Sequence, residues 1–175
     1  MKFTKKEILL GILIFLLFNK KQRKPMPTDK KEFIKYIYPF CVTIGNKIGV
    51  PPMFLLAQII LETNWGKSTL FTKYFNVGGI KAVKGQTFVS LPTYEYIKGV
   101  KTRINQNFAT YSDLGTGLNE YAKIFMNKYF NKYRNKTDNP KEFAKLLQSG
   151  AVKYATDINY TSKINSIIDN VNKYV

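Results

Sequence analysis

Residues 51–68 read PPMFLLAQIILETNWGKS and predict a helix that ends in a carboxylate. Proline is tolerated in the first helical turn, so Pro51 and Pro52 indicate where this helix starts. From position 53 to 61 every residue except Gln58 is apolar, which is typical of a helix with almost no solvated side. Glu62 follows at the helix end, and Gly66 is placed to act as the C-cap. We expect this helix to be the buried centre of the fold.

Glu62 has the position of a proton donor. Burial disfavours a charged carboxylate, and so does the negative end of the helix dipole, so both effects would raise the pKa of Glu62. A carboxylic acid with a raised pKa stays protonated near neutral pH and can act as a general acid. Gln58 lies one turn earlier on the same face. The competing interpretation is a solvated glutamate on the last turn of the helix.

The composition excludes several classes of chemistry. The 175 residues include no histidine, which rules out Ser–His and Cys–His nucleophilic catalysis. Cys41 is the single cysteine and lies in an apolar run, so we expect a core residue, no disulfide and no Cys/His zinc site. Catalysis would therefore depend on carboxylates, Tyr, Lys or amides, and we expect neither a metal nor a cofactor.

The chain is strongly basic, with 28 Lys and Arg, 11 Asp and Glu, and a net charge of +17. Residues 1–24 hold seven of the basic and one of the acidic residues, so residues 25–175 carry a net charge of +11. Such a surface attracts polyanions, namely nucleic acid, anionic lipid or the acidic polymers of a bacterial wall. Charge alone does not choose among them.

The N-terminal segment resembles an anchor or an export signal. Residues 8–18 form an unbroken apolar run, ILLGILIFLLF, with lysines on both sides. No small-residue cleavage site follows it, and it is shorter than the roughly 20 residues of a spanning helix, although flanking lysines can extend the span. We expect residues 1–24 to form a hydrophobic helix that serves as anchor or export segment, 25–28 a linker, and 29–175 one folded domain. The alternative is an apolar helix packed into a partner or into the chain's own core.

The rest of the chain predicts an α+β fold that is mainly α. Apolar residues keep a helical period from a cap at Thr28 or Asp29 to about residue 47. Ser68 is placed to cap a short helix that ends near residue 74. Further helices are expected after Ser112, after the cap pair Asn139–Pro140, and from 161 to 174. Residues 86–108 are instead rich in β-branched and aromatic types, broken by Pro92 and Gly99, and predict a two- or three-stranded antiparallel sheet. Glu95 would stand in its middle strand. A glutamate there is usually a solvent-facing residue.

Five sequence blocks in order resemble the glucosaminidases of glycoside hydrolase family 73. Residues 57–68, AQIILETNWGKS, resemble the AQxxLExxWGxS signature of this family. Four further blocks follow, over about residues 29–174 in all: NVGGIK at 76–81, TYEY at 93–96 with Gly99, FATY at 108–111, and YATDINY at 154–160 with Lys163 and Ile164. Two positions depart from the family pattern, since Ala109 replaces the usual Arg and Ile158 the usual Pro.

The resemblance implies a lysozyme-like fold and hydrolysis of peptidoglycan at the β-1,4 bond between N-acetylglucosamine and N-acetylmuramic acid. Glu62 would be the general acid, and Glu95 a base or a charge that stabilises the transition state. A carboxylate separation of ~6.5–9.5 Å would favour inversion and about 5 Å retention, and the substrate's acetamido group offers a third route. The expected substrate-binding residues are Gln58, Trp65, Asn76, Tyr154 and Tyr160. Trp65 would either stack on a sugar or fill the core.

Two other function classes remain open at this point. A lytic transglycosylase or muramidase of similar fold would need only Glu62. A non-catalytic basic protein would bind a wall or membrane, and no basic recognition helix or RNA-type aromatic motif favours nucleic acid. The expected partners are peptidoglycan glycan strands and anionic wall or membrane surfaces. We expect a monomer in a bacterial envelope, or a lytic protein encoded by a phage.

Overall fold

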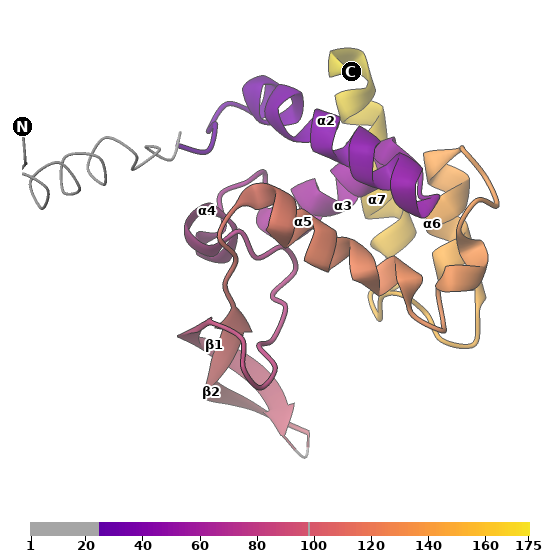
Figure 1. The fold of residues 1–175 in the computed structure, drawn as a ribbon. Coiled ribbons are helices and arrows are strands. Elements are labelled where there is room, and N and C mark those ends of the chain that lie inside the picture. Colours follow the sequence, from indigo (N-terminus) through magenta and orange to yellow (C-terminus); the bar gives the residue numbers. More distant parts are fainter. Residues whose placement is uncertain (1–24, 98) are drawn as a thin grey trace, which may run out of the picture.

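The computed structural model describes residues 25–97 and 99–175 as a body of helices from which one β-hairpin projects (Figure 1). This agrees with the mainly helical α+β prediction. The expected anchor over residues 1–24 lies outside the described residues. Within the described part, no helix is long and apolar enough to cross a membrane. The helices and strands are α2 (Lys30–Ile48), α3 (Pro52–Thr63), α4 (Thr69–Tyr74), β1 (Phe88–Ile97), β2 (Val100–Ala109), α5 (Leu114–Ala122), α6 (Pro140–Ser149) and α7 (Tyr160–Val171), with short 3-10 helices η1 (Lys123–Met126), η2 (Asn131–Tyr133) and η3 (Asn172–Tyr174).

Helix α3 is the centre of the core, as its apolar sequence predicts. It packs against α2, α6 and α7, and its residues from Phe54 to Ile60 are all buried. The prediction that Gly66 caps this helix is wrong. Asn64 is the C-cap, in the left-handed conformation, because Thr63 is the last helical residue. Gly66 is needed for packing instead, since a Cβ atom there would lie 2.3 Å from Cε2 of Phe33.

Most of the other α-helices begin directly after a residue whose side chain caps their first turn. The side chains of Asp29, Ser68 and Asn139 accept hydrogen bonds from backbone N–H groups of the first turns of α2, α4 and α6, as expected. At α5 the cap is Asp113 rather than Ser112, because the Asp113 carboxylate accepts from the N–H of Thr116. Cys41 is buried in the core, as predicted.

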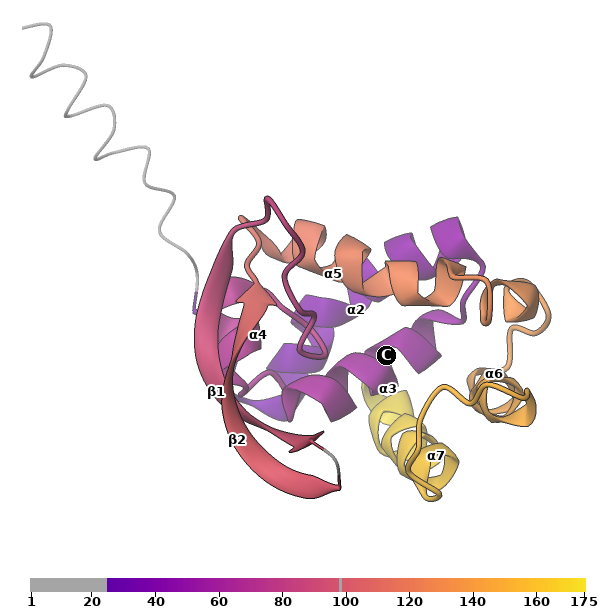
Figure 2. The ribbon, with the colours of Figure 1, turned by 90° about the horizontal axis from the view of Figure 1, so that it is seen from below.

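The sheet has two strands, so the three-stranded option is wrong. Strands β1 and β2 pair antiparallel, and Glu95 of β1 lies opposite Thr102 of β2. Glu95 is therefore not in a middle strand. Side chains alternate between an exposed outer face and a half-buried inner face, which holds Glu95, Thr102 and Ile104. Figure 2 shows the hairpin as a curved ribbon at one end of the helical body.

Asn76 fixes the chain between α4 and the hairpin. Its side chain is 1% exposed, and its Nδ2 donates to the carbonyl oxygens of Ile80 and Ala109, both at 2.8 Å. Its Oδ1 accepts from the N–H of Ile80 at 2.8 Å. One buried amide thus holds the glycine turn at 76–80 against the end of β2.

We expect Asn76→Ala to lower the free energy of unfolding by about 3 kcal/mol, since it leaves buried backbone groups without partners. Urea unfolding followed by circular dichroism measures this loss. The matched control is Asn105→Ala on the exposed outer face of β2, where a change within about 0.5 kcal/mol is expected. Equal stability of the two variants would show that the Asn76 hydrogen bonds do not hold the turn.

Candidate active site

Glu62 lies on the last turn of α3, at the point where the buried helix reaches the surface. The expectation of a buried carboxylate is wrong, because the Glu62 side chain is exposed. Neighbouring protein nevertheless removes part of its water. This partial desolvation raises the pKa of Glu62, against the lowering effect of a hydrogen bond from Gln58. The site therefore combines access for a substrate with a carboxyl group that holds its proton more tightly than a free glutamate.

Gln58 links Glu62 to the interior. Its side chain is 0% exposed, and its Nε2 donates to Oε1 of Glu62 at 3.1 Å and to the hydroxyl of Tyr154 at 3.1 Å. The hydroxyl of Tyr160 donates to Oε1 of Gln58 at 2.8 Å. With the Tyr160 hydroxyl donating to the carbonyl oxygen of the amide, both N–H groups of Gln58 are left for Glu62 and Tyr154.

The two tyrosines are themselves held by packing. The Tyr154 ring stacks on Phe125, with centroids 5.6 Å apart and planes 5° from parallel, and lies 5.4 Å from the Tyr160 ring. Burial raises the pKa of both hydroxyls, so both stay neutral and can donate a proton in a hydrogen bond. The segment between them is fixed by Asp157, whose carboxylate accepts from the N–H of Asn159 and from Nζ of Lys163.

Tyr121 on α5 completes this network, and the sequence analysis did not identify it as a site residue. It is buried, and its hydroxyl lies 3.1 Å from that of Tyr154. A Cβ atom at Gly78 would lie 3.0 Å from Cε2 of Tyr121 and 3.8 Å from the carboxyl carbon of Glu62. The turn at 76–81 therefore passes directly beside the acid, which explains why a residue without a side chain stands at position 78, where φ is +73°.

Glu95 on β1 forms an ion pair with Lys81, with Nζ and Oε1 2.9 Å apart. Lys81 belongs to the same turn as Gly78, and its backbone forms an isolated antiparallel β-bridge with Phe108 of β2. The turn thus contacts the surroundings of both carboxylates, Glu62 through Gly78 and Glu95 through Lys81. Lys81 had been noted only as part of a sequence block, and its role becomes visible once the hairpin is placed.

Three of the expected substrate-binding residues have other roles in the structure. Gln58, Asn76 and Tyr160 are 0%, 1% and 3% exposed, so they present no surface to a sugar and act by positioning other groups. Tyr154 is partly buried against the core. Trp65 also packs partly on the core, and Nζ of Lys30 lies 4.5 Å from its ring centroid, which favours the packing role over sugar stacking.

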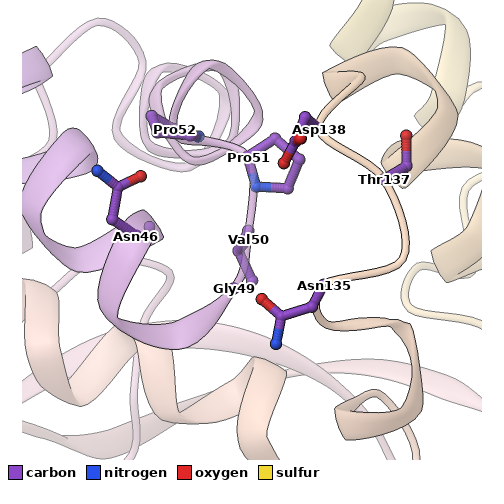
Figure 3. Close-up of a pocket in the computed structure, with 9 residues that line it drawn as sticks. Asn46, Gly49, Val50, Pro51, Pro52, Asn135, Thr137 and Asp138 are labelled. Carbon is purple, nitrogen blue, oxygen red and sulfur yellow. The ribbon is translucent and has the colours of Figure 1, made fainter.

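A pocket of about 180 Å³ lies at the other end of α3, where the α2–α3 connection meets residues 135–138 (Figure 3). The backbone N–H of Asn135 donates to the carbonyl oxygen of Gly49 at 2.8 Å, which ties the two segments together. Asp138 is the only carboxylate among the residues that line it, and it is exposed. This pocket lacks a desolvated acid and is separated from Glu62 by the length of α3.

Most of the chain matches a known protein family. The family model described as mannosyl-glycoprotein endo-beta-N-acetylglucosaminidase (Glucosaminidase) matches residues 38–173. The chain is 32% identical over 146 residues to exo-glucosaminidase LytG of Bacillus subtilis. The aligned region covers 81% of this chain and 51% of LytG. It is 30% identical over 161 residues to peptidoglycan hydrolase FlgJ of Pseudomonas aeruginosa, covering 86% of this chain and 39% of FlgJ. The chain thus spans about half or less of the length of these relatives.

Solved structures share the fold. The catalytic domain of the autolysin Auto from Listeria monocytogenes superimposes with a TM-score of 0.74 at 27% identity, over 100% of this chain and 99% of that domain. The fold of this chain is therefore shared with the catalytic domain of an autolysin. With a family match over residues 38–173, this chain belongs to the glucosaminidase family.

Proposed function

We propose that this chain hydrolyses peptidoglycan at the β-1,4 bond between N-acetylglucosamine and N-acetylmuramic acid. The observation that carries the proposal is the exposed carboxyl group of Glu62, with its raised pKa, held by the buried amide of Gln58. A proton donor that a substrate can reach is what cleavage of a glycosidic bond requires first. The names of the relatives, an exo-glucosaminidase and a peptidoglycan hydrolase, support the same substrate class.

In this mechanism Glu62 gives its proton to the oxygen of the leaving sugar as the bond to the N-acetylglucosamine carbon breaks. Positive charge then develops on that sugar ring. Glu95, from the half-buried face of β1, serves as the second carboxylate, as a base for water or as a negative charge near the ring. Lys81 neutralises Glu95 in the structure, so the ion pair would have to loosen when a glycan binds.

We also propose that the activity is exerted in the bacterial envelope, because FlgJ is by name a peptidoglycan hydrolase and Auto is by name an autolysin. The net charge of +11 on residues 25–175 would favour binding to an anionic wall. Residues 1–24, with their apolar run, remain our proposed anchor or export segment, and 29–175 the catalytic unit.

Mass spectrometry of muropeptides released from purified peptidoglycan tests the proposal. Products with N-acetylglucosamine at the reducing end are expected. Anhydro-muramic acid ends would instead identify a lytic transglycosylase that uses Glu62 alone. Products with reducing muramic acid would identify a muramidase, and no release at all would identify a non-catalytic binding protein.

Glu62→Gln is expected to reduce turnover of peptidoglycan by ~10²–10⁴-fold, because the amide keeps the shape of the acid but has no proton to transfer. Sedimentation with insoluble wall should stay nearly unchanged. Glu142→Gln, the same substitution at an exposed position of α6, is the matched control and should keep full activity. If Glu62→Gln retains more than about a tenth of the wild-type rate, Glu62 is not the acid.

Glu95→Gln is expected to lose less activity than Glu62→Gln, about 10²-fold or less, since water positioning and charge stabilisation can be taken over in part by the substrate's acetamido group. Turnover of both variants on the same wall preparation makes the comparison. Equal and complete loss in the two variants would instead indicate an indispensable pair of carboxylates.

The dependence of kcat/KM on pH tests whether Gln58 influences the ionisation of Glu62. Glu62 acts in its protonated form, so kcat/KM should fall as the pH rises through the raised pKa of Glu62. Gln58 lowers that pKa by donating to the carboxylate, so Gln58→Met should raise the pKa further. The alkaline limb then moves to higher pH while the maximal rate falls.

The control for this profile is Gln86→Met, in the exposed turn before the hairpin, which should leave the limb in place. A limb that stays fixed or moves to lower pH in Gln58→Met would separate Gln58 from the ionisation of the acid.

A further inference from the structure

Residues 123–136, KIFMNKYFNKYRNK, form a segment with five basic residues and no acidic one. This segment covers η1 and η2 and the turns around them. Its lysines at 123, 128, 132 and 136 are all exposed. One of them, Lys123, is paired with Glu120, with Nζ and Oε1 2.5 Å apart. The others leave the segment with a strong local excess of positive charge.

Apolar side chains are exposed among these lysines. Ile124, Met126 and Tyr129 are 39%, 50% and 45% exposed. Nζ of Lys128 lies 5.0 Å from the ring centroid of Tyr129, so the lysine stem and the ring share one surface. A dissolved polyanion would contact mainly the lysines of this surface. At the boundary of a lipid bilayer, lysines contact the headgroups and apolar side chains are buried beside them.

A hollow of about 370 Å³ continues this surface between α2 and α5. Ile48, Ala122 and Met126 contribute apolar walls, and Lys47, Lys123 and Arg134 also line it. The Arg134 guanidinium donates to the carbonyl oxygen of Ile48 and to Oδ1 of Asn131, which fixes η2 against the end of α2. The apolar depression is therefore a defined part of the fold with cations beside it.

We propose that residues 123–136 and this hollow form a contact site for the surface of an anionic phospholipid bilayer. The lysines would meet lipid phosphates, and Ile124, Met126 and Tyr129 would enter the interface between headgroups and acyl chains. The inference concerns a surface away from Glu62 and goes beyond the proposed hydrolysis, so either can fail without the other.

This surface lies away from the candidate active site. Figures 1 and 2 both show the 123–136 segment at the opposite end of the helical body from the β1–β2 hairpin. The turn beside Glu62 leads into that hairpin. A chain lying on a bilayer through residues 123–136 would thus hold its hairpin end away from the lipid, toward the wall.

A fluorescent reporter on the full-length chain tests the proposal. Because residues 8–18 are expected to bind membranes themselves, sedimentation with vesicles does not test residues 123–136. Met126→Cys labelled with the polarity-sensitive dye NBD does so, and Cys41, at 1% exposure, is protected from the label. A blue shift is expected with vesicles of phosphatidylglycerol and phosphatidylcholine, and a weak one with phosphatidylcholine alone. The same label at Ser90→Cys, on the outer face of the hairpin, should not shift.

Charge reversal provides the second arm. Lys128→Glu with Lys136→Glu should reduce the partition reported at position 126 by at least about 25-fold, at about fivefold per lysine. The matched control is Lys67→Glu with Lys84→Glu, two exposed lysines outside the segment, and should leave the shift unchanged. Far-UV circular dichroism and thermal unfolding confirm that each variant is folded.

Three outcomes would overturn the proposal. The first is an NBD reporter at position 126 whose emission does not shift on anionic vesicles. The second is an equal loss of the shift in the 128/136 pair of charge reversals and in the 67/84 control pair. The third is a blue shift with inorganic polyphosphate that equals the shift with lipid. The last result would identify the surface as a site for a dissolved polyanion.

Discussion

The hydrogen bond from Gln58 to Glu62 is the interaction on which the site depends. Gln58 is inside the core and Glu62 is at the surface, so this bond joins the rigid interior to the proposed general acid. Tyr160 donates to the carbonyl oxygen of this amide, and the amide nitrogen donates to the acid. The consequence is an acid whose position is set by buried packing, although its carboxylate is open to solvent.

The same bond opposes the desolvation that raises the pKa of Glu62. Desolvation favours the protonated form and the amide favours the charged form. A donor for a glycosidic oxygen needs both tendencies, since it must hold a proton at working pH and then stabilise the carboxylate once the proton has left. The tyrosines around Gln58 stay neutral because they are buried, so they add hydrogen bonds without adding charge.

The glycine turn has a comparable role for the second carboxylate. Asn76 holds the turn, Gly78 lets the backbone pass beside Glu62, and Lys81 reaches Glu95. The hairpin is joined to the helical body through this turn and through its own ends. Movement of the hairpin would therefore change the surroundings of Glu95 while leaving Glu62 fixed to α3, in keeping with the different roles proposed for the two carboxylates.

The sequence by itself determined the helices, their caps at Asp29, Ser68 and Asn139, the hairpin region and the family, because periodicity, capping residues and ordered motifs are local signals. It also placed Glu62 at the end of a buried helix. Only the tertiary structure decided that Glu62 is exposed, that Gln58, Asn76 and Tyr160 are buried, and that Tyr121 and Lys81 belong to the site. Those contacts join residues far apart along the chain, such as Gln58 with Tyr154 and Tyr160, and no local pattern records which side chains the packing of α3, α5 and α7 brings together.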